Sequence, residues 1–224
     1  VTRRQFAVIL DPCDDTGRPR LGQRKVVSNE QFFLRPGESL ENDAIRDVYV
    51  LGDDEALLLH AIEGFDDVDS NGEPIKRQSG EQWLRLGPGE YIPKDSVRVK
   101  KTGDSEKRCR IPLGVGEGIY VRETTTGDVR AVVGESYMLG AYEELWEKQL
   151  PAVVEEKLAQ QLGSHASYMD KQSGRSNAGG RDKTRLVRYH IPHNAVTQVF
   201  DYKKRTRRNI FGPNVVALGP DEEF

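Results

Sequence analysis

The chain has 224 residues, of which 36% are hydrophobic and 31% are charged, and its formal net charge is −3. With a mean hydropathy of −0.65, it carries too little apolar material for one thick core and is better suited to several small modules. The near-neutral charge balance gives no overall field that would attract nucleic acid or an anionic membrane.

The N-terminal stretch VTRRQFAVILDP places arginines before a short apolar run, as a signal peptide does. Asp11 ends this run too soon for a signal peptide, so we predict a strand over Phe6–Leu10. No apolar run reaches the roughly 18 residues of a membrane span. The two cysteines, Cys13 and Cys109, are too few for a disulfide framework and indicate a reducing compartment. We therefore expect a soluble, intracellular chain.

Short segments with alternating apolar and polar residues dominate the rest of the chain. Each is bounded by Gly, Pro, Asp or Asn, which is typical of closely spaced strands. These predicted strands are Arg46–Leu51, Glu55–Ile62, Asp95–Lys100, Gly118–Glu123, Val129–Gly134, Thr184–Ile191 and Ala195–Tyr202. The predicted fold class is all-β.

One order of features recurs along the chain: a strand, a polar turn, a second strand and then a motif. The motif reads NEQFFLRPGE at 29–38, GEQWLRLGPGEYIP at 80–93, GESYMLGAYEEL at 134–145 and FGPNVVALGPDEEF at 211–224. An ungapped alignment superposes Phe32, Trp83 and Tyr137. The motif residues of interest are Phe32, Trp83, Gly87, Pro88, Tyr91, Pro93, Gly134, Tyr137, Gly212 and Pro213.

Each copy predicts one small antiparallel module. An aromatic-led third strand packs onto the apolar face of a hairpin, and Gly-Pro then ends the pairing. An exposed, ligand-stacking aromatic platform is the alternative. A sheet of this size is insecure alone, so we expect tandem modules stacked end to end. The predicted bounds are 1–52, 53–109, 110–183 and 184–224.

One region departs from the strand pattern. Apolar residues near helical spacing, Pro151 at a first turn and Gly163 at the exit predict a short helix over about 152–162. The following segment, 164–183, is polar and rich in Ser and Gly, so we predict a disordered insertion inside the third module.

Two charged turns are candidate functional sites. DVDSNG, at 67–72, resembles the first half of a calcium loop through Asp67, Asp69 and Asn71, but Gln78 stands where the twelfth-position glutamate belongs. The favoured interpretation is an acidic hairpin tip. A basic tip in the fourth module carries Lys203, Lys204, Arg205, Arg207 and Arg208. We expect it to be solvated or to contact an acidic tip of a neighbouring chain, with RNA phosphates as the alternative.

No catalytic motif emerges. HIPH, with His190 and His193, lacks a third metal ligand, and LGVGEG at 113–118 resembles a dinucleotide-binding turn only superficially. We expect no enzyme activity, no cofactor and no resident metal. An intracellular β-repeat scaffold that binds other proteins along a sheet edge is the rival to a purely structural role.

Several longer stretches resemble the major vault protein family. They include GIYVRETTTGDVRAVVGESYML, ELWEKQLP and HIPHNAVTQVFDYKKRTRRNIFGPNVVALGPDEEF, and FAVILDPCDDTGRPRLGQRKVV fits as well. The resemblance runs through the whole chain in order, and it corresponds to the last tandem vault repeats before the shoulder domain of that family.

The resemblance implies a structural shell protein. Family members line up side by side, and many copies close into the barrel wall of the vault ribonucleoprotein particle by lateral self-association. The implied partners are copies of the chain itself, a poly(ADP-ribose) polymerase-like protein and a telomerase-associated protein. The particle also holds a small vault RNA, which we do not expect this segment to bind. The implied location is the cytoplasm with a minor nuclear fraction, and no membrane is expected.

Overall fold

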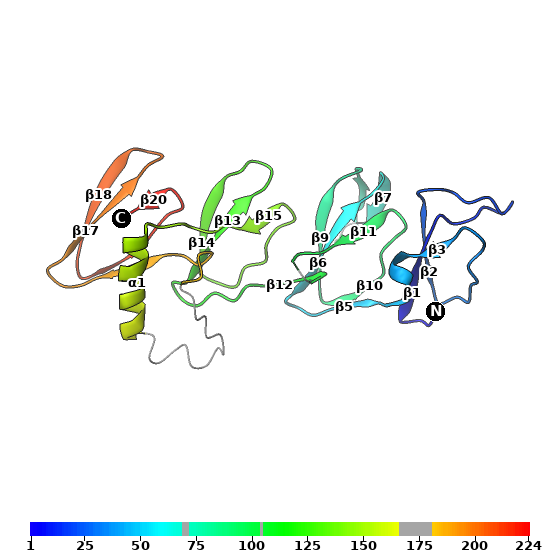
Figure 1. The fold of residues 1–224 in the computed structure, drawn as a ribbon, viewed down its shortest axis with the longest axis horizontal. Helices are drawn as coiled ribbons and strands as arrows, with labels where there is room; N and C mark the ends of the chain where they lie inside the picture. The colour runs from blue at the N-terminus through cyan, green and yellow to red at the C-terminus, as the bar shows by residue number, and fades with distance from the viewer. Residues whose placement is uncertain (69–71, 104, 166–180) are drawn as a thin grey trace. The chain divides into compact units, whose positions relative to one another are not determined.

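Short strands separated by turns fold into small antiparallel sheets, as the sequence predicts (Figure 1). In this computed structural model we describe residues 1–68, 72–103, 105–165 and 181–224, with the backbone alone for 159–165. The chain divides into two compact units, Val1–Arg110 and Ile111–Phe224. We describe each unit by itself.

The first unit is built around two central strands, β1 and β6. β1 pairs with β2, β3 and β4, while β6 pairs with β9, β11 and β12; β5–β10 and β7–β8 form separate two-stranded sheets. The elements are β1 (Gln5–Leu10), β2 (Arg24–Ser28), β3 (Ser39–Leu40), the 3-10 turn η1 (Glu41–Asp43), β4 (Arg46–Asp47), β5 (Tyr49–Leu51), β6 (Glu55–Ala61), β7 (Phe65–Val68), β8 (Pro74–Arg77), β9 (Gln82–Leu86), β10 (Gly89–Tyr91), β11 (Val97–Lys100) and β12 (Lys107–Cys109).

The second unit repeats this plan around β13 and β17. β13 lies between β14 and β15, β17 lies between β18 and β20, and β16 pairs with β19. The elements are β13 (Gly118–Glu123), β14 (Val129–Val133), β15 (Glu143–Leu145), α1 (Ala152–His165), β16 (Arg188–Ile191), β17 (Val196–Asp201), β18 (Thr206–Phe211), β19 (Asn214–Ala217) and β20 (Glu222–Glu223).

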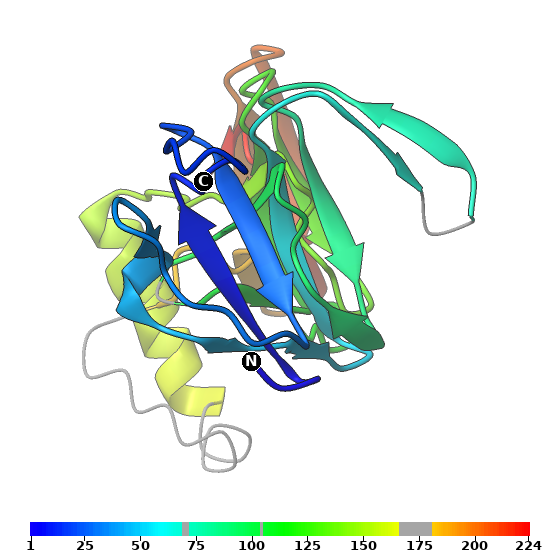
Figure 2. The ribbon, with the colours of Figure 1, turned by 90° about the vertical axis from the view of Figure 1, so that its right-hand side faces the viewer.

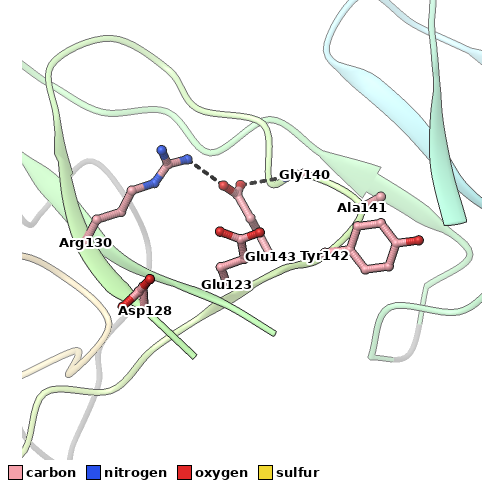
Figure 3. Close-up of a pocket in the computed structure, with 7 residues that line it drawn as sticks. All are labelled: Glu123, Asp128, Arg130, Gly140, Ala141, Tyr142 and Glu143. Carbon is pink, nitrogen blue, oxygen red and sulfur yellow. Dashed lines mark hydrogen bonds and ion pairs between the residues drawn. The ribbon is translucent and has the colours of Figure 1, made fainter. Parts of the chain in front are cut away.

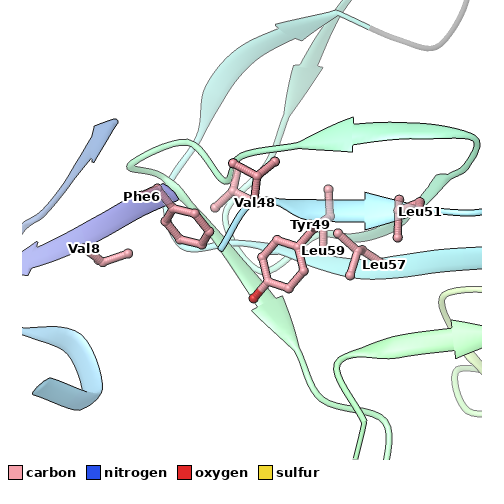
Figure 4. Close-up of a cluster of buried hydrophobic side chains, with 8 residues drawn as sticks. Phe6, Val8, Val48, Tyr49, Leu51, Leu57 and Leu59 are labelled. Atoms are coloured by element: carbon pink, nitrogen blue, oxygen red, sulfur yellow. The ribbon is translucent and has the colours of Figure 1, made fainter. Parts of the chain in front are cut away.

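The core of the first unit joins its two main sheets. Phe6 of β1 is fully buried, and its ring centroid lies 5.9 Å from that of Tyr49 in β5. Leu57 and Leu59 of β6 belong to the same cluster (Figure 4). Val97 of β11 is also part of it. Burying such side chains contributes roughly 1.5–3 kcal/mol each. Neither sheet buries its apolar face alone, because each supplies part of one shared core.

The core of the second unit forms around Tyr120 of β13. Leu158 from α1 packs there with Val187 and Leu218, and the Trp146 ring meets Tyr120 edge to face at 5.8 Å. The Tyr120 hydroxyl donates to Leu218 O at 2.8 Å. The predicted helix is therefore confirmed as a core element, and Figure 1 shows it beside the strands of this unit.

The helix and the predicted insertion differ in extent from the sequence expectation. α1 runs to His165 rather than ending near residue 162. Most of the predicted disordered segment, residues 166–180, lies outside the described residues. Arg181, at its far end, is firmly attached: its side chain is 11% exposed and pairs with Glu155 of α1.

The structure contradicts the place of Trp83 in the sequence alignment with Phe32 and Tyr137. Trp83 lies within β9, opposite Leu59 of β6. Phe32 and Tyr137 do share a place, because each lies outside the named strands shortly after the second strand of its module, β2 or β14. Tyr137 also makes an isolated bridge with Ile111. The shared letters Glu-Gln before Phe32 and Trp83 produced the false match.

The cause of this error is an inserted hairpin. Strands β7 and β8 form a two-stranded sheet between β6 and its partner β9, and Figure 2 shows this hairpin reaching away from the sheet of β6. The other three central strands, β1, β13 and β17, pair directly with the next strand along the chain. The insertion displaces Trp83 relative to the repeat.

Candidate functional site

A glutamate-closed turn recurs six times in the described residues. In each four-residue turn, the glutamate carboxylate accepts a hydrogen bond from the backbone N–H of the first residue, at 2.8–3.0 Å. The backbone N–H of the glutamate returns a bond to the first residue's carbonyl at 2.9–3.3 Å. The turns end at Glu38, Glu55, Glu81, Glu117, Glu143 and Glu222.

These turns lead into strands β3, β6, β9, β13, β15 and β20. Their sequences are RPGE, GDDE, QSGE, GVGE, GAYE and GPDE. The stretch at 113–118 that superficially resembled a dinucleotide-binding turn is one of them. Sequence reasoning missed this signature because it searched for aromatic and Gly-Pro signals, whereas the structural repeat is a glutamate three residues after the turn begins.

The Gly-Pro pairs of the predicted motif lie where two backbone segments approach each other closely. A Cβ at Gly87 would lie 2.1 Å from Gly52 O, and one at Gly212 would lie 1.9 Å from Pro192 O. Gly87 N–H donates to Glu55 O at 3.0 Å, and Gly212 N–H donates to Ala195 O at 2.9 Å. These glycines hold the end of one strand against the start of another, and only glycine fits there.

Trp83 and Tyr91 are both half-buried against the core of the first unit. The Trp83 ring lies 6.2 Å from Phe65, and the Arg77 guanidinium stands 4.5 Å above it. Pro93 is buried, whereas Pro88 and Pro213 are exposed. Trp83 thus packs inward, whereas the neighbour of Phe32 in the first copy of the motif, Phe33, is 93% exposed.

Three ion pairs join the two sides of a sheet across its central strand. In the sheet of β1 the acid, Glu41, lies in η1 directly after β3. Arg24 pairs with Glu41 at 2.9 Å across β1, Arg208 pairs with Glu222 at 2.8 Å across β17, and Arg130 pairs with Glu143 across β13. The same kind of pair recurs in three sheets. Many charged side chains of this chain are therefore paired within their own module.

The hollow at the third of these pairs is a candidate small-molecule site (Figure 3). Its volume is about 280 Å³, and Glu123, Asp128, Arg130 and Glu143 line it. Burial alone would raise the pKa of Glu143, but hydrogen bonds from Gly140 N–H, the Tyr137 hydroxyl and Arg130 lower it. A carboxylate held ionised by three donors is suited to bracing a turn rather than to general-base catalysis near neutral pH.

Asp67 of the acidic tip is paired with cations of its own unit. Lys94 Nζ lies 2.7 Å from Asp67 Oδ1, and Arg77 Nε lies 3.8 Å from Asp67 Oδ2. Burial would raise the pKa of Asp67, but the Lys94 hydrogen bond and the two cations lower it. Asp69 and Asn71 lie outside the described residues. Asp67 therefore braces the hairpin against the sheet, which leaves it little capacity to bind calcium or a neighbouring chain.

The basic tip forms the turn between β17 and β18 and is mostly exposed. Lys203 lies 3.8 Å from Asp221, Lys204 lies 3.7 Å from Asp201, and Arg208 pairs with Glu222. Arg207 stands 5.5 Å over the Phe200 ring. For Arg205 and Arg207, no ion pair is found within the described part of the chain. These two are the cations of the tip best placed for an external partner.

The described residues contain no group of three or more His, Cys, Asp or Glu side chains that could hold a metal ion. His190 and His193 lie in β16 and just after it, so their spacing follows from a strand end. Within the described residues, no helix is long and apolar enough to span a membrane.

Comparison with known proteins matches three segments to family models. Each model is described as a major vault protein repeat domain, and the matched residues are 49–94, 110–169 and 186–224. Proteins named major vault protein are similar over nearly the whole chain. The zebrafish (Danio rerio) protein is 48% identical over 99% of this chain, and the sea urchin Strongylocentrotus purpuratus protein is 45% identical over 100%.

The human (Homo sapiens) protein of the same name is 45% identical over 98% of the chain. The chain spans about a quarter of the length of these relatives, namely 26%, 25% and 24% for the zebrafish, sea urchin and human proteins. The similarity thus covers the repeats described above and leaves most of each relative outside the comparison.

Proposed function

Because this chain belongs to the major vault protein family of repeat domains, we propose that it is a non-enzymatic wall segment of the vault particle. Its modules form part of the barrel wall, and lateral association between identical chains closes that wall. The near full-length similarity to proteins named major vault protein carries the proposal. The repeated sheets, with their glutamate-closed turns and internal ion pairs, support a structural role rather than a catalytic one.

The partners follow from the same proposal. The main partner is another copy of the chain, and the poly(ADP-ribose) polymerase-like and telomerase-associated proteins are further components of the particle. Vault RNA is present in the particle but does not bind through this segment. The proposed location is the cytoplasm with a minor nuclear fraction.

The basic tip is the part of this chain that we assign to lateral contact. Lys203, Lys204 and Arg208 are partly neutralised by acidic neighbours within the unit. Arg205 and Arg207 therefore contribute most of the charge available to a neighbouring chain. An exposed ion pair contributes only about 0–1 kcal/mol, so the isolated segment remains monomeric. Ring closure by many copies multiplies these small contributions, because each added contact becomes effectively intramolecular.

Charge reversal tests this assignment. In the full-length protein that carries this segment, Arg205→Glu with Arg207→Glu should lower the yield of closed particles, measured by sedimentation and negative-stain electron microscopy. The matched control is Arg3→Glu with Arg20→Glu, two exposed arginines of the first unit, which should leave the yield unchanged. Normal particles from the first variant would show that the tip plays no part in assembly.

The same experiment addresses the scaffold alternative. A module that binds other proteins along a sheet edge would lose one partner on mutation while self-assembly stayed intact. Co-sedimentation of the other particle components with each variant distinguishes the two outcomes.

A further inference from the structure

A partly open polar cavity lies between the two main sheets of the first unit, those of β1 and β6. Its volume is about 150 Å³, and it lies where β1, β2, η1 and β4 meet β11. Four cationic side chains and two carboxylates line it. They are Arg24, Arg46, Arg98, Lys101, Glu41 and Glu106. The cavity therefore carries an excess of two positive charges.

Both carboxylates are already committed. Glu41 accepts from Arg24 Nη2 at 2.9 Å, and its second oxygen lies 3.8 Å from Arg98. Glu106 accepts from Arg46 Nη2 at 2.7 Å and from the Tyr49 hydroxyl at 2.7 Å. Burial would raise the pKa of Glu106, but these hydrogen bonds and the charges of Arg46 and Lys101 lower it. Glu106 is thus held ionised, and the four cations outnumber the two carboxylates by two.

The excess positive charge matters most at Arg24, which is buried. Its side chain is only 8% exposed, so bulk water solvates it poorly. One nitrogen, Nη1, donates to Val97 O at 3.1 Å, while Nε is buried without a hydrogen-bond partner. A buried cation that is incompletely paired is unfavourable and favours an anion nearby.

We propose that this cavity binds a free tetrahedral dianion, such as inorganic phosphate or sulfate, which links the sheet of β1 to the sheet of β6. A dianion matches the excess charge. Its oxygens suit guanidinium and ammonium donors, which pair readily with phosphate. Since a water molecule occupies about 30 Å³ of liquid, the cavity holds one such ion with little hydration and excludes a nucleotide or a peptide chain.

Binding has a mechanical consequence. Arg24 and Arg46 belong to the sheet of β1, whereas Arg98 and Lys101 lie in β11 and directly after it. An anion held by both pairs fastens the two sheets together. It stabilises the first unit by an amount that grows with the logarithm of its concentration. This proposal does not depend on the assignment of the chain to a particle wall.

An NMR titration of the intact chain, in which the amide chemical shifts are recorded, tests the proposal directly. Sodium phosphate and sodium sulfate should each shift the Asn42 and Arg98 amides saturably, whereas sodium chloride at equal ionic strength should not. A phosphoserine hexapeptide represents the alternative source of the same phosphate group and should not bind. Equal shifts with chloride, or tighter binding of the peptide than of phosphate, would overturn the proposal.

Two exposed cations allow a variant that keeps the core intact. Arg98→Gln with Lys101→Gln removes the excess charge and the 3.8 Å contact of Arg98 with Glu41, but it keeps the buried 2.9 Å pair between Arg24 and Glu41. It should weaken phosphate binding by at least tenfold. The matched control, Arg122→Gln with Lys157→Gln, removes two exposed cations of the second unit and should bind phosphate as the unmodified chain does. Unchanged affinity in the first variant would contradict the site.

Discussion

Glu143 illustrates how one side chain organises a module. Its carboxylate accepts from Gly140 N–H at 2.8 Å and from the Tyr137 hydroxyl at 2.7 Å, and it pairs with Arg130. A turn, an aromatic residue and the far edge of the sheet thus depend on one ionised group. Because hydrogen bonds to charged groups contribute more than neutral ones, protonating Glu143 should weaken all three contacts together.

The pH dependence follows from the pKa of Glu143, which is lower in the folded chain than the ordinary value of 4.5. A lowered pKa means that the unfolded chain binds the proton more readily, so this stabilisation is complete above about pH 4.5 and is lost as the pH falls through the folded value. Glu143→Gln should therefore reduce stability at neutral pH and flatten the acid limb of the stability curve. Urea unfolding monitored at Trp146, between pH 3 and 7, measures both effects.

Glu144 supplies the control for this experiment. It lies on the same strand but is 53% exposed, and its partner Arg122 is 3.7 Å away. Glu144→Gln should leave the acid limb of the second unit unchanged. Equal flattening by both substitutions would show that general charge repulsion, rather than the closed turn, sets the pH dependence.

Among single residues, the sequence was informative about glycine and weak about acids. Gly87 and Gly212 could be singled out from the sequence, because a Gly-Pro pair ends strand pairing wherever it occurs. The structural role of Glu143 was not predictable, since its partners Arg130 and Tyr137 come from other parts of the module. The contacts of Asp67 were not predictable for the same reason: the spacing of an acidic turn is local, whereas Lys94 and Arg77 reach Asp67 from outside that turn.

Among the elements, the first turn of α1 is held by the side chain of Arg181, in addition to the packing of Leu158 in the core. Arg181 donates from Nη2 and Nε to the two oxygens of Glu155 at 2.8 and 3.2 Å, and also from Nη2 to Lys148 O at 3.0 Å. The Arg181 side chain is 11% exposed. The first turn of the helix is thus fixed by a residue that follows it by more than twenty positions.

Removing the Arg181–Glu155 ion pair should destabilise the second unit. Arg181→Ala should lower the free energy of unfolding by about 2–3 kcal/mol, because it leaves Glu155 and a carbonyl without their donor. In a double-mutant cycle with Glu155→Ala, the two effects should be clearly non-additive. The exposed pair Arg122–Glu144 should show a coupling of only about 0–1 kcal/mol in a parallel cycle. Additivity at Arg181 and Glu155 would mean that the pair does not hold the helix.

The type of each element was more predictable than its place. Strands such as β13 and the helix α1 follow from apolar spacing, which depends on nearby residues alone. The tip of the hairpin β7–β8 was predicted as an acidic hairpin tip, but its strands were not among the predicted ones, because Phe65–Val68 mixes two acids with two apolar residues and buries little. Its insertion before β9 then shifted Trp83 out of register with the repeat. A local pattern carries no information about which strands pair.

At the scale of the whole molecule, each unit has a core of its own. Leu57 is fully buried in the first unit and Leu218 in the second, and each belongs to a separate apolar cluster. Trp83 reports on the first unit and Trp146 on the second, since each lies against its own cluster. The chain therefore carries one fluorescent probe per unit.

The separate cores predict two unfolding transitions rather than one. Leu57→Ala should destabilise the first unit by about 2–5 kcal/mol, the usual range for a buried leucine, and should shift only the transition seen at Trp83 in a Trp146→Phe background. Leu218→Ala should shift only the transition seen at Trp146 in a Trp83→Phe background. Tryptophan fluorescence during guanidinium unfolding measures both. If either leucine variant shifts the two transitions equally, the two units unfold cooperatively, and a two-state description applies to the whole chain.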